Sequence, residues 1–326
     1  MSSFVEIVNL EKTFRGRGLS KKGAHSFTAV DNISLNIERN SVFGLVGESG
    51  CGKTTLSRSV LYLDPPTSGE IKIDGIDLGS LSTSRLRNFR KRIQIVFQDP
   101  NSSLNPKMSI ENSIKEGLYN LGYASGETGR RQKLDQRVDE LLDLVGITPG
   151  HKKRYPHEFS GGQKQRIVIA RALSVEPDFM ILDEPVSNLD VSIQAQIINL
   201  LIELKEKLSL TYLFISHDLN LVSYLSDRIA VMFKGQIVEA GTVEDLMTPV
   251  HPYTMKLFSS IPGINRIDEE QDLVFHVEEA GYSEGLPEGY CFYAGEDSEA
   301  KVEMLEINDG HVVACFKDNR IERRKL

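Results

Sequence analysis

The chain has 326 residues, of which 40% are hydrophobic and 26% are charged, as is usual for a globular protein with a sizeable core. Its formal net charge is −8 and it has no lysine- or arginine-rich arm, which argues against a general grip on nucleic acid. No apolar run approaches the roughly 18 residues of a membrane span, the N-terminus lacks a signal-peptide pattern, and three cysteines make no disulfide framework, so we expect a cytosolic protein.

Strands and turns dominate the first hundred residues. Strands are predicted at residues 4–8, around Ile33–Ile37 and at Ser41–Val46, the last being a short apolar run suited to a buried strand. A helix-compatible run follows at Thr54–Leu63, and the turn-rich segment after it indicates a small antiparallel excursion through Ile71–Ile73.

The middle of the chain is mostly helical. The helical pattern runs from Leu104 to Leu173 and is interrupted at glycine and proline positions, namely Gly117, Gly126, Gly146 and Pro149. Strands are predicted both before and after this stretch, so a run of helices inserted midway predicts a separate helical lobe.

Strands and helices alternate again beyond the helical stretch. Strands are predicted at Phe179–Leu182, Thr211–Ile215 and Arg228–Phe233, with a helix over Ile193–Leu208 between the first two. This alternation favours an α/β fold with a mostly parallel sheet. After Pro262 acidic residues, glycines and tyrosines dominate, which indicates a small appended module or an extended tail.

Residues 47–54 match the pattern G-x-x-x-x-G-K-[ST], between an apolar strand and a helix. The glycines let successive backbone N–H groups surround phosphates, and the helix N-terminus adds a favourable field. Lys53 can reach the terminal phosphates, and the Thr54 hydroxyl can bind Mg²⁺. For Cys51, next to Lys53 and a helix N-terminus, we weigh a reactive thiol of low pKa against an inert small residue. The predicted ATP contacts of this phosphate loop are Gly47, Glu48, Ser49, Gly50, Cys51, Gly52, Lys53, Thr54 and Thr55.

A second apolar strand, Phe179-Met-Ile-Leu, ends in two carboxylates. Asp183 can orient Mg²⁺ through water, and Glu184 is placed to polarise the water that attacks the γ-phosphate. Many core strands end in acidic residues, so this pattern indicates a catalytic site only together with the phosphate loop.

The sequence Phe-Ser-Gly-Gly-Gln at residues 159–163 resembles the signature motif of ABC ATPases. General phosphate-loop chemistry does not require such a motif. It precedes a helix beginning near Lys164, so its backbone amides and the Ser160 hydroxyl form a second phosphate-binding helix end.

Other motifs of the ABC ATPases follow in the order that the family has. Gln98 in Ile-Val-Phe-Gln-Asp-Pro resembles the Q-loop that senses Mg²⁺, and residues 187–190 resemble the D-loop of the dimer interface. His217 in Ile-Ser-His-Asp resembles the switch histidine that contacts the γ-phosphate. The resemblance implies an aromatic side chain stacked on adenine, for which Phe14 is the candidate and Phe27 the rival.

Four longer stretches are similar to the ATPases of oligopeptide, dipeptide and nickel importers: FQDPNSSLNPKM, RYPHEFSGGQKQRIVIARAL, DEPVSNLDVSIQAQIINLL and HPYTMKLFSSIP. The resemblance covers residues 4–262. It implies a P-loop ABC ATPase with a mostly parallel core sheet, an N-terminal antiparallel β-subdomain and an inserted helical subdomain. We expect the nucleotide-binding domain at residues 1–262, its helical subdomain at about 100–175, and a small C-terminal extension of the oligopeptide-transporter type at 263–326.

The resemblance further implies a head-to-tail dimer with ATP between the two subunits. One subunit holds ATP through Phe14, the phosphate loop, Gln98 and Asp183. The partner covers it with Ser160, Gly161, Gly162 and Gln163, and Asp190 lies at the dimer interface.

In this arrangement Glu184 acts as general base or orients the attacking water. The catalytic set is completed by Lys53, Gln98 and His217, and Mg²⁺ is held by Thr54, Gln98 and Asp183. ATP and Mg²⁺ are therefore the expected cofactors.

The expected partners are a second ABC ATPase subunit, either a copy or a paralogue, and two membrane-spanning permease subunits. An external substrate-binding protein takes part indirectly, and no nucleic acid is expected. The chain would then lie on the inner face of the cell membrane, docked through the lobe around residues 101–117. Whether the transported substrate is a peptide or nickel is not encoded here.

The alternative class is a soluble ABC ATPase that acts on ribosomes or DNA. Ribosomal members of the family carry two ATPase units in one chain, and only one phosphate loop exists here. DNA-repair members insert long coiled coils between Gln98 and the signature motif, and this interval is short and not heptad-like. Both observations favour the importer.

Two features depart from the family pattern. Asn188 stands where these importer ATPases usually have alanine. Many relatives also end in a module with four cysteines that hold an iron–sulfur cluster, whereas only Cys291 and Cys315 are present here, so no cluster is expected. Zinc bound with the help of His276 and His311 is the weaker alternative, since no C-x-x-C spacing supports it.

Overall fold

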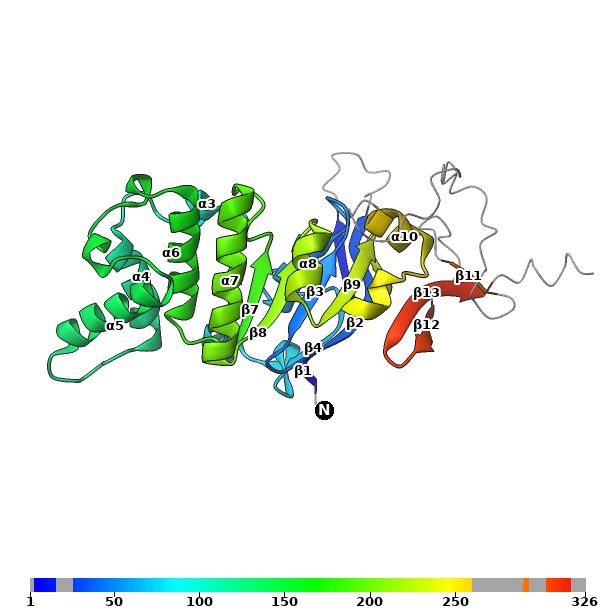
Figure 1. Ribbon diagram of the computed structural model, residues 1–326. Coiled ribbons are helices and arrows are strands. Elements are labelled where there is room, and N and C mark those ends of the chain that lie inside the picture. Colours follow the sequence, from blue (N-terminus) through cyan, green and yellow to red (C-terminus); the bar gives the residue numbers. More distant parts are fainter. Residues whose placement is uncertain (1–2, 16–25, 260–289, 293–302, 318–326) are drawn as a thin grey trace, which may run out of the picture.

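The computed structural model describes residues 3–15, 26–259, 290–292 and 303–317, and the strands and helices of this part form a mixed α/β fold (Figure 1). His276, named only for the weaker zinc alternative, lies outside the described residues. The predicted combination of a largely parallel main sheet and an antiparallel N-terminal sheet is confirmed.

The main sheet has a parallel centre and an antiparallel end. Its nine strands include five parallel ones in the order β9, β3, β8, β7, β6. These five are β3 (Val42–Val46), β6 (Ile93–Val96), β7 (Phe179–Asp183), β8 (Thr211–Ile215) and β9 (Arg228–Phe233). The antiparallel end consists of β10 (Gln236–Thr242), β11 (Tyr290–Phe292), β12 (Glu303–Asn308) and β13 (His311–Lys317).

Alternate residues of the central strands face two different hydrophobic cores, as the two-residue period of a strand requires. In β7, Met180 and Leu182 belong to the core shared with the helices, whereas Phe179 and Ile181 belong to the core under the antiparallel sheet. Both faces of the parallel centre are therefore buried, which explains why these strands are continuous apolar runs.

The antiparallel sheet covers one face of the main sheet. Its strand order is β2, β1, β4, β5. The strands are β1 (Ser3–Arg15), β2 (Ser26–Glu38), β4 (Ser68–Ile73) and β5 (Ile76–Asp77).

The helices fall into two groups. Around the main sheet lie α1 (Lys53–Val60), α7 (Val191–Leu208), α8 (Leu219–Leu225), α9 (Val243–Met247) and α10 (Pro252–Ser259). Between β4 and β7 in sequence lie α2 (Thr83–Phe89), α3 (Pro100–Ser103), α4 (Ile110–Leu121), α5 (Arg130–Leu144) and α6 (Gly161–Leu173), with 3₁₀ turns η1 (Leu78–Ser80), η2 (Arg90–Arg92), η3 (Pro149–His151) and η4 (Pro156–Glu158). None of the described helices has the length and apolar character needed to cross a bilayer.

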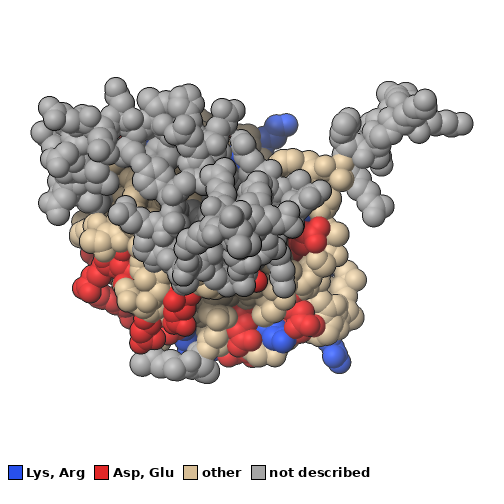
Figure 2. Space-filling view, turned by 90° about the vertical axis from the view of Figure 1, so that its right-hand side faces the viewer, with Lys and Arg blue, Asp and Glu red and all other residues tan. Residues whose placement is uncertain are grey.

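The helical lobe and the C-terminal strands lie at opposite ends of the molecule. In Figure 1, α4, α5 and α6 form one end and β11, β12 and β13 the other, with the parallel strands between them. Figure 2 looks onto the end with the C-terminal strands and shows acidic side chains gathered along its lower part.

The predicted interruption at Gly117 is wrong, because α4 runs through this position from Ile110 to Leu121. A Cβ atom at Gly117 would lie only 2.0 Å from the Ser174 Oγ atom. The glycine therefore permits close packing of α4 against the end of α6, which a sequence pattern cannot distinguish from a helix break.

Candidate active site

The phosphate loop, residues 47–52, joins β3 to α1 and is packed against other backbone. A Cβ atom at Gly47 would lie 2.2 Å from the Met232 carbonyl oxygen, and one at Gly52 would lie 2.2 Å from the Ala29 carbonyl oxygen. Backbone atoms cannot yield as a flexible side chain can, so only glycine fits at both positions. The loop is thereby held between β2 and the end of β9.

Lys53 is buried at the first position of α1 and its side chain reaches back over the loop. Its Nζ atom donates hydrogen bonds to the carbonyl oxygens of Gly47 at 2.7 Å and Glu48 at 2.9 Å. A cationic group thus lies inside the curve of the loop, where the N-terminus of α1 adds positive potential. This arrangement attracts an anion such as a phosphate.

Asp183, the last residue of β7, is only 5% exposed and lies near the start of α1. The Ser57 hydroxyl is 3.5 Å from Asp183 Oδ2. Burial raises the pKa of Asp183, and a hydrogen bond from Thr54 opposes part of this effect. A buried carboxylate of this kind is stabilised when a cation binds beside it.

Glu184 and His217 meet at the carboxyl ends of two neighbouring parallel strands. Asp183 of β7 is in register with Ile215 of β8, so the residues that follow both strands lie close together. The His217 Nδ1 atom is 3.4 Å from Glu184 Oε2. Glu184 has a left-handed backbone conformation (φ +49°), which is uncommon for a side-chain-bearing residue and occurs often at functional sites.

Gln98 follows β6 and lines a groove that contains part of the same site. The groove has a volume of about 1290 Å³, and its lining includes Thr54, Gln98 and Asp183, the three residues predicted to serve Mg²⁺. The structure therefore brings together the phosphate loop, Asp183 and Gln98, all at the carboxyl ends of parallel strands.

Asn188, which departs from the family pattern, also contacts the Gln98 segment. Its Nδ2 atom donates to the Gln98 carbonyl oxygen at 3.4 Å. Alanine cannot make this bond, so the asparagine adds a direct link between the residues 187–190 and the turn after β6.

Ser160 to Gln163 form the N-terminus of α6 at a separate place. The Ser160 and Gln163 side chains each bond to the other residue's backbone N–H group, which is a capping box. A Cβ atom at Gly162 would lie 2.4 Å from Ile193 Cγ2, so this position also requires glycine. In the part of the chain that the structure describes, no hydrogen bond joins these four residues to the phosphate loop.

Asp190, predicted at the dimer interface, is the N-cap residue of α7. Its side chain makes no capping hydrogen bond there. The following residue, Val191, is an apolar side chain with 81% exposure.

The two candidate adenine-stacking residues are cross-strand partners. Phe14 of β1 is in register with Phe27 of β2, so both rings lie on the same face of the antiparallel sheet. Phe14 is 43% and Phe27 63% exposed. Both remain candidates, since Ala29, two residues from Phe27, contacts Gly52 of the phosphate loop.

The hypothesis of a low-pKa thiol at Cys51 is wrong. The side chain is 8% exposed, and burial raises the pKa of the thiol even though Lys53 acts in the opposite direction. Sequence proximity showed the lysine, but it could not show that the thiol packs into the core beneath the antiparallel sheet. Cys51 therefore remains a predicted ATP contact only through its backbone.

Two residues of the site were not predicted from sequence. Ser57, one helical turn after Lys53, contacts Asp183. Tyr253, within the stretch HPYTMKLF, accepts a hydrogen bond from the Glu48 backbone N–H group at 3.2 Å. The spacing from Lys53 could have pointed to Ser57, whereas nothing in the motif pattern points to Tyr253.

Comparison with known proteins identifies the class that this fold and site define. A family model described as "ABC transporter" matches residues 30–187. The chain is 48% identical over 312 residues to the "Dipeptide transport ATP-binding protein DppF" of Lactococcus lactis subsp. cremoris, covering 95% of this chain and 93% of the relative. It is 50% identical over 315 residues to the "Oligopeptide transport ATP-binding protein OppF" of Streptococcus mutans, covering 96% and 95%.

Solved structures agree with this result. A dimeric ATP-binding cassette bound to ADP and Pi has a TM-score of 0.63 at 30% identity, covering 73% of this chain and 98% of that one. The cbiO1 protein from Clostridium perfringens, part of the transporter complex cbiONQ, has a TM-score of 0.64 at 27% identity, covering 80% and 97%. The chain belongs to the ABC transporter family as an ATP-binding subunit that hydrolyses ATP.

Proposed function

We propose that this chain hydrolyses ATP to power the import of oligopeptides or dipeptides through a membrane transporter. The observation that carries the substrate class is the near full-length identity of 48–50% to two relatives named for dipeptide and oligopeptide transport. The nucleotide-binding domain comprises residues 1–262 with its helical subdomain at about 100–175, and residues 263–326 form the C-terminal extension.

The residues at the strand ends divide the work of ATP hydrolysis. Lys53 and the amides of the phosphate loop hold the phosphates. Glu184 either accepts a proton from the attacking water or orients that water. His217 Nδ1, 3.4 Å from Glu184 Oε2, orients that carboxylate, and in this proposal His217 also contacts the γ-phosphate of bound ATP. The backbone of Glu184 is held at the end of β8 by the bond from its N–H group to the Ile215 carbonyl oxygen at 2.9 Å.

The oxygen-rich groups beside the phosphate loop fit Mg²⁺. Thr54, Gln98 and Asp183 offer hydroxyl, amide and carboxylate oxygens along one groove, which are the ligands that this hard cation prefers. Bound there with ATP, the ion supplies charge neutralisation for the phosphates. The burial of Asp183 supports this assignment, since a buried carboxylate requires a compensating positive charge.

A second ABC ATPase subunit, a copy or a paralogue, completes the site in this proposal. The exposed Ser160 and Gln163 at the start of α6 cover the nucleotide of the partner, and the backbone N–H groups of that helix end face its phosphates. Support comes from the dimeric solved structure of an ATP-binding cassette to which the chain is similar. Asp190 and its neighbours before α7 lie in the interface.

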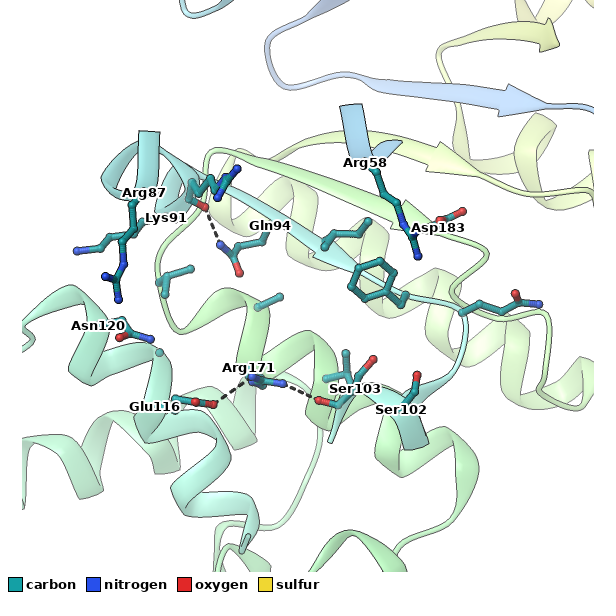
Figure 3. Close-up of a pocket in the computed structure, with 18 of the residues that line it drawn as sticks. Arg58, Arg87, Lys91, Gln94, Ser102, Ser103, Glu116, Asn120, Arg171 and Asp183 are labelled. Atoms are coloured by element: carbon teal, nitrogen blue, oxygen red, sulfur yellow. Dashed lines mark hydrogen bonds and ion pairs between the residues drawn. The ribbon is translucent and has the colours of Figure 1, made fainter. Parts of the chain in front are cut away.

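The groove beside Gln98 has one side formed by the lobe around residues 101–117, and this side is the proposed docking site for a membrane-spanning permease subunit. Figure 3 shows that the groove extends from Arg58 and Asp183 at one side to Arg87, Lys91 and Asn120 at the other. When docked to the permease, the chain lies at the inner face of the membrane. A substrate-binding protein outside the cell delivers the peptide.

Arg171 shapes the wall of this groove that belongs to the helical lobe. It donates to the Ser103 carbonyl oxygen at 2.6 Å and pairs with Glu116 at 3.1 Å (Figure 3). The wall thus joins α3, α4 and the last turn of α6.

The experiment that tests the substrate class is uptake by cells that lack the gene for this chain. We expect loss of uptake of labelled di- and oligopeptides, restoration by the wild-type gene, and no restoration by Glu184→Gln. Nickel uptake serves as the matched control and stays unchanged. Normal peptide uptake with lost nickel uptake would reassign the substrate, and normal uptake of both would reject the proposal.

A further inference from the structure

Tyr253, near the start of α10, contacts the phosphate loop although it belongs to none of the nucleotide-binding motifs. Its hydroxyl accepts the Glu48 N–H at 3.2 Å. The Glu48 carbonyl oxygen in turn accepts from Cys51 N at 3.3 Å and Lys53 Nζ at 2.9 Å. Both backbone groups of Glu48 are therefore held, one by Tyr253 and the other by the loop itself.

The turn after β9 supports the same loop from beneath. The Gly235 N–H donates to the Cys51 carbonyl oxygen at 2.9 Å, and Met232 packs against Gly47. Between them in sequence, Phe233 places its ring 4.3 Å from that of Tyr253, centroid to centroid, at an interplanar angle of 35°. Tyr253 and the end of β9 thus contact each other through their aromatic rings and both contact the phosphate loop. We call these residues the loop support.

A buried carboxylate connects the loop support to the C-terminal strand. Glu239 of β10 is fully buried and lies 2.9 Å from Nε2 of His311 in β13, which is 3% exposed. The same carboxylate accepts the N–H groups of Val250 at 2.8 Å and His251 at 3.1 Å, just before α10. Glu239 therefore ties β10, β13 and the start of α10 together.

The position of Tyr253 depends on this connection. The Tyr253 N–H donates to Nδ1 of His251 at 3.2 Å, so the residues bound to Glu239 also orient the first turn of α10. Backbone pairing of Glu239 with Val313 adds a second attachment of β13 to β10. A buried carboxylate that loses a hydrogen-bonding partner is costly, so removing His311 forces the residues around Glu239 to rearrange.

We propose that Tyr253 is a positioning residue for the phosphate loop, and that the C-terminal strand β13 holds Tyr253 in place through the contact between His311 and Glu239. The proposal rests on the assignment of residues 47–54 as the ATP-binding loop. It gives the C-terminal region a role in ATP affinity that requires no metal cluster.

The test measures KM for ATP and kcat separately, with the full-length chain in its assembled transporter. Tyr253→Phe keeps the ring against Phe233 and removes only the hydroxyl. We expect KM for ATP to rise about three- to tenfold, the range for loss of one neutral hydrogen bond, while kcat changes less than about twofold. Tyr224→Phe is the matched control, since Tyr224 is 67% exposed on α8, and it leaves both parameters unchanged.

Variants of His311 test the connection to the C-terminal strand. His311→Ala should raise KM for ATP in the same way, and His311→Gln, which keeps a donor for Glu239, should restore most of the affinity. In the double variant with Tyr253→Phe, His311→Ala should add almost nothing, because both changes remove the same support. If His311→Ala does not fold, His311→Asn, whose shorter amide does not reach Glu239, takes its place in the single and double variants.

Each result has one meaning. An unchanged KM in Tyr253→Phe, or a loss confined to kcat, overturns the role of Tyr253. Additive effects in the double variant overturn the connection to β13. Failure of the wild-type transporter to bind ATP would instead overturn the assignment of the loop, which separates the two claims.

Discussion

At the scale of single residues, the catalytic pair depends on strand register. Glu184 and His217 are 33 positions apart in sequence and meet because β7 and β8 are parallel neighbours. Each motif could be found in the sequence by its flanking strand. The contact between their side chains could not, because it needs the strand order of the folded sheet.

Glu184→Gln tests the assignment of the general base. The change keeps the shape of the side chain and removes its charge and basicity. We expect ATP binding to persist and steady-state ATP turnover of the assembled transporter to fall at least about a hundredfold, the usual effect of losing general base catalysis. Turnover at the wild-type rate would show that another group activates the water.

The ionised carboxylate of Asp183 lowers the stability of the fold in the absence of a cation, and this cost can be measured. Burial raises the pKa of Asp183, so the folded chain holds this proton more tightly than the unfolded chain does. Deprotonation therefore subtracts stability as the pH rises through the unfolded and then the folded pKa. The ionised carboxylate is retained at a cost to the fold, as expected for a residue that serves a bound cation.

Asp183→Asn should thus raise the melting temperature at about pH 7 by roughly 2 °C, and the difference should shrink as the pH falls through the raised pKa of the folded state, because the wild-type carboxyl then becomes protonated and neutral. The variant should also lose the additional stabilisation that Mg-ATP gives the wild type. Asp143→Asn on the exposed side of α5 is the matched control. A lower melting temperature for Asp183→Asn at neutral pH would contradict the account.

At the scale of elements, a glycine inside a helix or strand indicates that another element packs closely against the backbone there. Gly44 lies in the middle of β3, and a Cβ atom there would be 2.4 Å from Val222 Cγ1 and 2.6 Å from Ser226 Oγ of the α8 region. Helix α8 therefore packs directly on the backbone of the strand that leads into the phosphate loop. Like Gly117, this glycine serves packing between elements rather than a turn.

Gly44→Ala should push α8 away from β3 and lower the free energy of unfolding by about 1–3 kcal/mol, as overpacking does. Gly150→Ala is the control, because its nearest neighbour would be 4.0 Å away. Chemical denaturation of both variants measures the difference. Equal stability of the two variants would show that α8 moves without cost.

The elements themselves were largely readable from local patterns. Predicted strands at Phe179–Leu182, Thr211–Ile215 and Arg228–Phe233 correspond to β7, β8 and β9 within one residue. Each of these strands is an apolar run of only five or six residues, a length that suits a buried parallel strand and is too short for a typical helix. The misjudged positions, such as Gly117, are those where a distant element decides which side chain fits.

At the scale of the whole molecule, the order of the motifs was sufficient to predict the family and the fold. It did not predict how the C-terminal region is attached. Sequence reasoning treated residues 263–326 as an appended module. The structure adds β13 to the main sheet beside β10 and buries His311 against Glu239. Pairing between strands this far apart in sequence leaves no local signal. The contact of His311 with Glu239 could therefore not be set against the weaker zinc alternative before the fold was known.

The whole-molecule claim is that ATP hydrolysis at Glu184 drives peptide import. Its most direct measurement is ATP-dependent accumulation of a labelled peptide in proteoliposomes that contain the assembled transporter with either wild-type chain or Glu184→Gln. We expect accumulation with the wild type and none above the ATP-free level with the variant, although both bind ATP. Equal accumulation with the two chains would contradict it.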